Sequence, residues 1–490
     1  MATAALLLWL IVAPMLFAAL PAVPALLWGV LLPYLFLPEA YAINLPGLPD
    51  INKTSAITIG LMLALALYWN KFTDALTQAP TTLSSRSFRF GLTLCLSLSL
   101  LSIVGSVLNN QEALRFGPTL LPALRPWDVI SAIAAFALYI TPFLFARRYL
   151  ATPETHRALL RVITIMGLIY TLLMLIEIRL SPQLHAWVYG YYQHSFAQHI
   201  RDGFRPMVFL QHGLWVGFFI FTATIAAAAL WKAEKKIQWF WAALWLFFIL
   251  MISRNLGAFA IGVLSLAVFF GLWTRMQVRV VVAVALIILF YPGLRQANFI
   301  PIKQITSVAA TVSAARAGSL QYRLDNEDAL LERAFLKPLT GWGGYKRDRI
   351  FNELGQDISI SEGRWIQTIG RSGWIGYIGL FGLLTLPILF LPIVRRRKAI
   401  PPETLALGLI GMGNLIYMIP NSTLTPVSWL IFGALAGFVQ YDVAAQIGGT
   451  VFSAKTAPNR NHYTRFPPKA QAAREDNAYS SQGSHNRLAV

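Results

Sequence analysis

Four arginines in the connections between apolar segments are the residues best suited to bind a charged substrate. Arg205 directly precedes an apolar segment, Arg254 lies in a very short connection, and Arg323 and Arg364 belong to one long polar stretch at 295–372. Charges beside long apolar segments are costly and often functional. The guanidinium group presents a planar fork of donors that matches phosphate oxygens. Converging from separate connections, these arginines would suit a diphosphate.

The arginines also have structural interpretations. Arg205 precedes Pro206 at a segment start, where its side chain can extend towards water. Arg323 is followed by acidic residues at 325–328, which offer local ion pairs. Arg254 is harder to explain in this way, because its connection is too short to lift it far from the apolar segments.

Glu362 is the candidate general base. It is the one acidic residue between Ser359 and the following apolar segment. A carboxylate beside arginines could accept the proton of an attacking hydroxyl group. The alternative is an ion pair with Arg364 or Arg371.

Other titratable residues in this part of the sequence are expected to be structural or solvated. His212 lies inside an apolar segment and is expected to bond a neighbouring helix. His194 and His199 are expected in a loop, and Arg295 and Arg347 as solvated loop charges.

The familiar motifs of soluble enzymes are absent from the sequence. It has no GxxxxGK[ST] phosphate loop and no HExxH or CxxC metal motif, and it lacks a GxSxG nucleophile motif. No acidic cluster has metal-ligand spacing, so neither a metal nor a cofactor is predicted. ATP-driven transport by this chain alone is not expected, and the single Cys95 excludes an internal disulfide.

The composition is that of a membrane protein. The 490 residues are 56% hydrophobic and 12% charged, about half the charge of a soluble domain. The formal charge of +19 is spread over connections between apolar segments, which is the pattern that retains Lys and Arg on the cytoplasmic side. The charge therefore does not indicate a nucleic-acid partner.

The apolar segments predict an all-α polytopic fold with about 12 transmembrane helices, or 13 if the N-terminal apolar stretch crosses twice. We expect both termini to be cytoplasmic. The segments lie near 3–20, 22–37, 55–69, 88–107, 128–146, 157–177, 206–231, 237–252, 256–274, 277–292, 372–394, 403–420 and 425–440. The predicted parts are an N-terminal bundle at 1–292, a large periplasmic loop at 293–371, C-terminal helices at 372–442 and a disordered basic cytoplasmic tail at 443–490.

The large loop is predicted to contain one amphipathic helix over 320–336. Ser319 could cap this helix, and Pro338 would end it. The glycines of the GWGG sequence at 341–344 would form a turn. The helix could lie on the outer membrane face, cover a site, or pack against the rim of the bundle.

Residues 200–380 resemble the O-antigen ligase and Wzy-type O-antigen polymerase family of bacterial membrane glycosyltransferases. The stretches that carry the resemblance are FRPMVFLQHG, SRNLGAFAIG, the loop helix followed by PLTGWGGY, and the WxQxxxxxGxxG entry from Trp365 to Gly376. Three helices after the loop are also similar to the family.

The resemblance implies a GT-C-like, metal-independent enzyme of the inner membrane. Its donor would be an oligosaccharide on undecaprenyl diphosphate, held by Arg205, Arg254, Arg323 and Arg364. Its acceptor would be a saccharide on the periplasmic face, with membrane lipids and a chain-length regulator as further partners.

The resemblance leaves the acceptor open. Ligases typically carry a histidine about eleven residues before the glycine of the helix entry, and Glu362 occupies that position here. We therefore prefer a polymerase of lipid-linked repeat units for O-antigen or exopolysaccharide, with a ligase to lipid A core as the alternative. A polysaccharide flippase or transporter is the non-enzyme alternative, although the charges gather outside the apolar segments.

Overall fold

The computed structural model describes residues 1–44, 49–78, 85–200, 203–297 and 314–441, together with 299, 304, 306, 307, 310 and 311. The predicted cytoplasmic tail at 443–490 lies outside the described residues. The α-helices are α1 (Ala2–Ala19), α2 (Ala22–Phe36), α3 (Lys53–Leu67), α4 (Trp69–Gln78), α5 (Arg86–Leu108), α6 (Pro126–Tyr149), α7 (Pro153–Leu180), α8 (Leu184–Tyr189), α9 (Gly213–Glu234), α10 (Ile237–Ile252), α11 (Leu256–Gly271), α12 (Thr274–Gln296), α14 (Ala314–Phe335), α15 (Arg364–Leu389), α16 (Leu391–Arg395), α17 (Pro402–Tyr417) and α18 (Pro426–Gln440).

Long apolar helices dominate the described part of the chain. Seven of them are long and apolar enough to cross a membrane: α1, α5, α6, α7, α9, α12, and α15 together with α16. Four shorter apolar helices are α2, α10, α11 and α18. The helices indicate a multi-pass membrane protein, as expected from the apolar segments. The count of about 12 spans stays a prediction.

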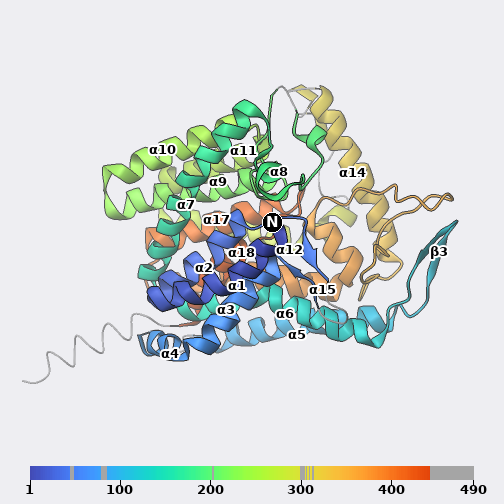
Figure 1. Cartoon of the computed structure of the whole chain (residues 1–490), viewed down its shortest axis with the longest axis horizontal. Helices are drawn as coiled ribbons and strands as arrows, with labels where there is room; N and C mark the ends of the chain where they lie inside the picture. Colours follow the sequence, from blue (N-terminus) through green and yellow to red (C-terminus); the bar gives the residue numbers. More distant parts are fainter. Residues whose placement is uncertain are drawn as a thin grey trace, which may run out of the picture. The chain divides into compact units, whose positions relative to one another are not determined.

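Helices α9 and α18 lie in the interior of the helical assembly, and Figure 1 shows both among the other helices. Helix α9 has buried side chains all round, from Val216 to Leu230, and packs against α7, α10, α11 and α17. Helix α18 is buried along its whole length and packs chiefly against α6. A helix that is apolar on every face suits the interior of such an assembly or a membrane span.

Small residues bring α5 and α15 close together. Gly376, Gly379 and Gly382 of α15 are spaced by three residues, so they share one face of the helix. A Cβ atom at Gly379 would lie 2.7 Å from the backbone nitrogen of Ser99 on α5, and one at Gly382 would lie 2.6 Å from the Cys95 Sγ. Helix backbones approach this closely only at small residues.

Helix α15 is interrupted at Gly373, and the turn at 338–343 fills the break. Gly373 has φ 59° and ψ −166°, a conformation restricted to glycine. The amides of Trp342 and Gly343 donate to the carbonyls of residues 370 and 371, at 2.9 and 2.8 Å. In return, the amides of Trp374 and Ile375 donate to the carbonyls of residues 338 and 339, at 2.8 and 3.1 Å.

The sequence located this turn and the end of α14 correctly, but not the starts of α14 and α15. Gly341 and Gly343 have positive φ angles of 69° and 74°, as a glycine turn requires. Helix α14 begins at Ala314, so Ser319 lies inside the helix rather than at its cap. Helix α15 begins at Arg364, ahead of the apolar segment that starts near 372, because its first turns are polar.

Two small antiparallel hairpins complete the described fold: β1 (Ala42–Ile43) with β2 (Ile51–Asn52), and β3 (Leu114–Phe116) with β4 (Thr119–Leu121). The second hairpin packs on the large loop. The Phe116 ring stacks on Phe351 with 5.0 Å between centroids, and the Thr119 hydroxyl donates to the Gly355 carbonyl at 2.8 Å.

Arg347 links the large loop to the connection between α5 and α6. Its side chain is fully buried, so the expectation of a solvated charge is wrong. Its Nη1 donates to the carbonyls of Glu112 and Pro122, both at 2.8 Å. These two carbonyls satisfy Nη1, whereas the buried Nε and Nη2 have no hydrogen-bond partner.

Replacing Gly373 by alanine should destabilise the protein by about 2–4 kcal/mol, because the backbone conformation is strained for any other residue. The new Cβ would also lie 2.3 Å from the Leu339 carbonyl. Thermal unfolding of the detergent-purified protein measures the effect. Gly271→Ala is the matched control, since nothing lies within 4 Å of a Cβ there, and equal melting temperatures for the two variants would contradict the role of the break.

Candidate functional site

Arg205 and Arg254 meet beside the start of α9. Arg205 donates from Nη2 to the Arg254 carbonyl at 3.2 Å. Glycines make room for both side chains: a Cβ at Gly213 would lie 2.4 Å from the Arg205 Cδ, and one at Gly203 would lie 2.6 Å from the Arg254 Nη2. Arg254 itself has a φ of 58°, which is uncommon for a residue other than glycine. The two guanidinium groups are therefore held by their backbone surroundings.

Arg323 of α14 lies near the same histidine as Arg205, since both act electrostatically on His212. Burial and neighbouring groups, Arg205 and Arg323 among them, lower the pKa of His212 to about 2. His212 caps α9 and is neutral at physiological pH, so the arginines carry the charge of this region. We call Arg205, Arg254 and Arg323 the arginine cluster; they come from three separate connections.

Glu362 pairs with Arg323 of this cluster. Its Oε2 lies 2.9 Å from the Arg323 Nη2, and the two side chains are 40% and 33% exposed. The contact is an ion pair and not a hydrogen bond, because the Glu362 Oε2 has no hydrogen-bond partner. The ion pair expected as an alternative role for Glu362 is therefore present, but with Arg323 in place of Arg364 or Arg371. Arg371 pairs with Asp348 at 3.3 Å, and Asp328 near Arg323 pairs with Arg295 at 2.8 Å.

Three histidines lie next to the arginine cluster. His194, His199 and His212 bring ligand nitrogens within 4.8 Å of one another, and form the one such group of potential metal ligands found among the described residues. The ring centroids of His199 and His212 are 4.4 Å apart. The sequence separated these residues into a loop and an apolar segment, so this contact was missed.

The hydrogen bonds of these histidines fit helix capping better than metal binding. The His212 Nδ1 accepts from the Leu214 amide at 3.0 Å, and the His199 Nε2 accepts from the Gly213 amide at 3.2 Å. Each bond uses the lone pair that a metal would need. The first amides of a helix need such acceptors, and the two histidines supply them to α9.

Glu177 positions the segment that carries the arginine cluster into α9. Its carboxylate is buried and accepts from the amides of Met207 and Val208, both at 2.7 Å, and of Leu184 at 3.0 Å. Three amide donors compensate a buried carboxylate. This residue lies in an apolar helix, and its isolated charge was the signal in the sequence that could have identified it.

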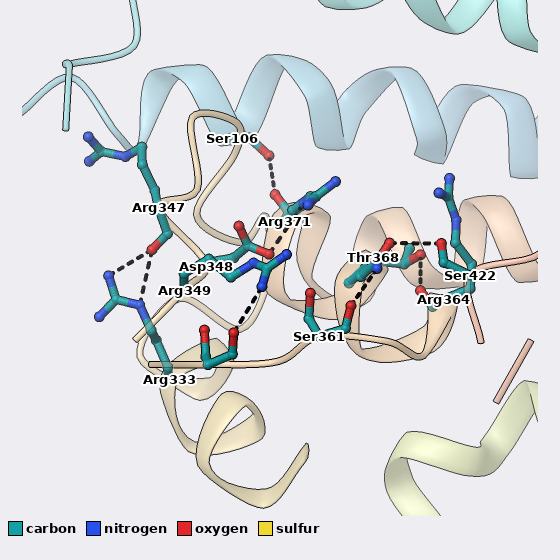
Figure 2. Close-up of polar contacts among 12 residues, drawn as sticks. Ser106, Arg333, Arg347, Asp348, Arg349, Ser361, Arg364, Thr368, Arg371 and Ser422 are labelled. Carbon is teal, nitrogen blue, oxygen red and sulfur yellow. Dashed lines mark hydrogen bonds and ion pairs between the residues drawn. The ribbon is translucent and has the colours of Figure 1, made fainter. Parts of the chain in front are cut away.

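Arg364, which the sequence grouped with the other three arginines, faces cavities of its own. It is the first residue of α15 (Figure 2) and lines three cavities of about 800, 330 and 200 Å³. None of the three cluster arginines lines these cavities. The Arg364 guanidinium carbon lies 5.8 Å from the ring centroid of Tyr139, which also lines all three cavities.

The middle cavity has a buried ion pair in its wall that the sequence did not reveal. Lys53, at the start of α3, is 5% exposed. Its Nζ lies 3.1 Å from the Glu39 Oε2 and donates to the Phe209 carbonyl at 2.8 Å. Lys53 therefore links Glu39, in the connection after α2, to the segment before α9.

No protein-family model matches the chain, and no curated protein is similar to it. The functional argument therefore depends on the residues and their geometry. A group of three guanidinium groups beside a carboxylate can bind a multiply charged anion and accept a proton from a neighbouring hydroxyl.

Glu327 makes the packing of α14 against α15 sensitive to pH. It accepts a hydrogen bond from the Trp365 Nε1 at 3.2 Å, and burial raises its pKa to about 7, opposed by Trp365 and Arg295. The folded protein therefore keeps a proton on Glu327 that the unfolded chain loses above about pH 4.5. Stability should fall as the pH rises from about 4.5 to 7, by up to about 3 kcal/mol.

Glu327→Gln should remove this pH dependence, because the amide oxygen still accepts from Trp365 and does not ionise. Thermal unfolding at pH 5 and pH 8 measures it in the full-length protein. Glu332→Gln on the same helix is the control, since Glu332 is exposed. An unchanged pH dependence in Glu327→Gln would show that Glu327 does not control it.

Proposed function

We propose that the chain is a glycosyltransferase of surface polysaccharide biosynthesis in the bacterial inner membrane. It transfers a glycan from undecaprenyl diphosphate to an acceptor saccharide on the periplasmic face. The observation that carries the proposal is the arginine cluster beside Glu362, built from three separate connections. The resemblance of residues 200–380 to O-antigen ligases and Wzy-type polymerases supports the same function.

The chemistry needs a stabilised leaving group and a base. The acceptor hydroxyl oxygen attacks the anomeric carbon, and the bond from that carbon to the diphosphate oxygen breaks. The hydroxyl proton passes to Glu362, and the lipid diphosphate leaves with its charge balanced by the guanidinium groups. Attack opposite the leaving group inverts the anomeric configuration. This scheme requires no metal and no cofactor.

The ion pair between Arg323 and Glu362 couples donor binding to the base. While the pair persists, Arg323 competes with the hydroxyl proton for the carboxylate. A bound diphosphate carries more charge than one carboxylate and draws Arg323 towards itself. Glu362 is then free to act as a base only when the donor is present, which would limit wasteful hydrolysis.

The preferred reaction is polymerisation of lipid-linked repeat units, with a chain-length regulator as a partner. Glu362 stands where ligases typically have a histidine, which favours the polymerase over the ligase that attaches polymer to lipid A core. The glycans of a deletion strain separate the two. A polymerase predicts single lipid-linked repeats and no long polymer, whereas a ligase predicts polymer that stays on the carrier lipid. Lipid-linked repeats that stay on the cytoplasmic face of the deletion strain would instead indicate a flippase or transporter, and unchanged glycans in both pools would contradict both enzymes.

Alanine at both Arg254 and Arg323 should reduce polymer formation by about 100-fold or more, since each cation stabilises the departing diphosphate. Polymer length and amount in complemented deletion cells, at matched membrane levels of protein, measure the effect. The control is the double variant Arg115→Ala, Arg179→Ala, which removes two exposed arginines. Full polymer in the Arg254, Arg323 variant would refute the diphosphate site.

A further inference from the structure

The cavity of about 330 Å³ at Arg364 has the walls of a saccharide site. Its lining includes the amide side chains of Gln211 and Gln367, the Ser422 hydroxyl, and the rings of Trp215 and Tyr139. A few directed polar groups between aromatic faces are what fix a polar ligand in a pocket, and the volume lies within the usual range of ligand pockets, about 300–1,000 Å³.

The charges of the cavity leave one guanidinium uncompensated. Glu39 and Lys53 neutralise each other in the wall, at 3.1 Å, whereas Arg364 is in none of the ion pairs found among the described residues. Its Nε is buried and makes no hydrogen bond. Arginine in such a setting selects a carboxylate or phosphate oxygen.

The cavity also lies next to the candidate base. Gln367 donates to the Ser361 carbonyl at 2.8 Å, and its Oε1 accepts from the Ser422 hydroxyl at 2.9 Å. Residue 362 follows directly and faces Arg323 of the arginine cluster. A ligand in the cavity would therefore lie next to Gln367, and a diphosphate at the arginine cluster next to Glu362, five residues earlier on the same segment.

We propose that this cavity binds an acidic sugar of the acceptor saccharide, with Arg364 holding its carboxylate. The inference rests on the proposed function and assigns the two cationic regions to two substrates. Arg205, Arg254 and Arg323 hold the donor diphosphate, and Arg364 selects the acceptor. The polymer made by this protein then contains an acidic sugar in each repeat.

Saturation-transfer NMR on the full-length protein in lipid nanodiscs tests this with D-glucuronate and D-glucose as probes. The wild type should bind glucuronate about tenfold or more tightly than glucose, and Arg364→Gln should remove that preference, with partial rescue by Arg364→Lys. Arg205→Gln should leave glucuronate binding within about twofold, and should weaken inorganic diphosphate binding by about tenfold or more.

Equal binding of the two sugars, an unchanged preference in Arg364→Gln, or no binding of glucuronate would each overturn the acidic-sugar site. Diphosphate binding that is weakened by Arg364→Gln and not by Arg205→Gln would overturn the assignment of the two regions. If wild-type protein binds glucuronate but no diphosphate, the proposed donor site fails while the acidic-sugar site stands.

Discussion

The break in α15 at Gly373 is the constraint on which the rest of the large loop depends. A continuous helix would bond the amides of residues 374 and 375 to the carbonyls of residues 370 and 371. Here the backbone of the turn at 338–343 replaces these bonds: it donates to the carbonyls of residues 370 and 371 and accepts from the amides of residues 374 and 375. Buried backbone groups in an apolar helix must be paired, so the turn and the helix fix each other. Helix α14, which precedes the turn, and residues 364–372, which follow the loop, are positioned by this one insertion.

Two positively charged regions follow from that arrangement. Helix α14 brings Arg323 to Glu362 and near His212 at the start of α9, and the polar first turns of α15 bring Arg364 into cavities that the arginine cluster does not line. Glycines and backbone acceptors position the Arg205 and Arg254 side chains, and Arg323 pairs with Glu362. This separation suits a reaction between two substrates, one with a diphosphate and one with a smaller anionic group.

Much of the helical fold could be predicted from the sequence, because apolar length and Gly and Pro punctuation act locally. Each of the predicted apolar segments contains a helix, and the GWGG turn has the positive φ angles that its glycines permit. The predicted start of α14 is wrong, because the helix begins at Ala314 and continues through Ser319 despite the preference of serine for a helix N-cap. Three features depend on residues distant in sequence, which no local pattern encodes. They are the burial of Arg347, the ion pair between Glu362 and Arg323, and the contact of the three histidines. Arg364 was grouped with the other arginines for the same reason, since charge and loop membership do not reveal the direction of a side chain.

A structure of the protein with bound undecaprenyl diphosphate tests the central claim most directly. The account predicts both phosphates within about 2.7–3.2 Å of guanidinium nitrogens of Arg205, Arg254 and Arg323, with the ion pair between Arg323 and Glu362 opened. A diphosphate seated in the cavities at Arg364, with the arginine cluster unchanged, would contradict it.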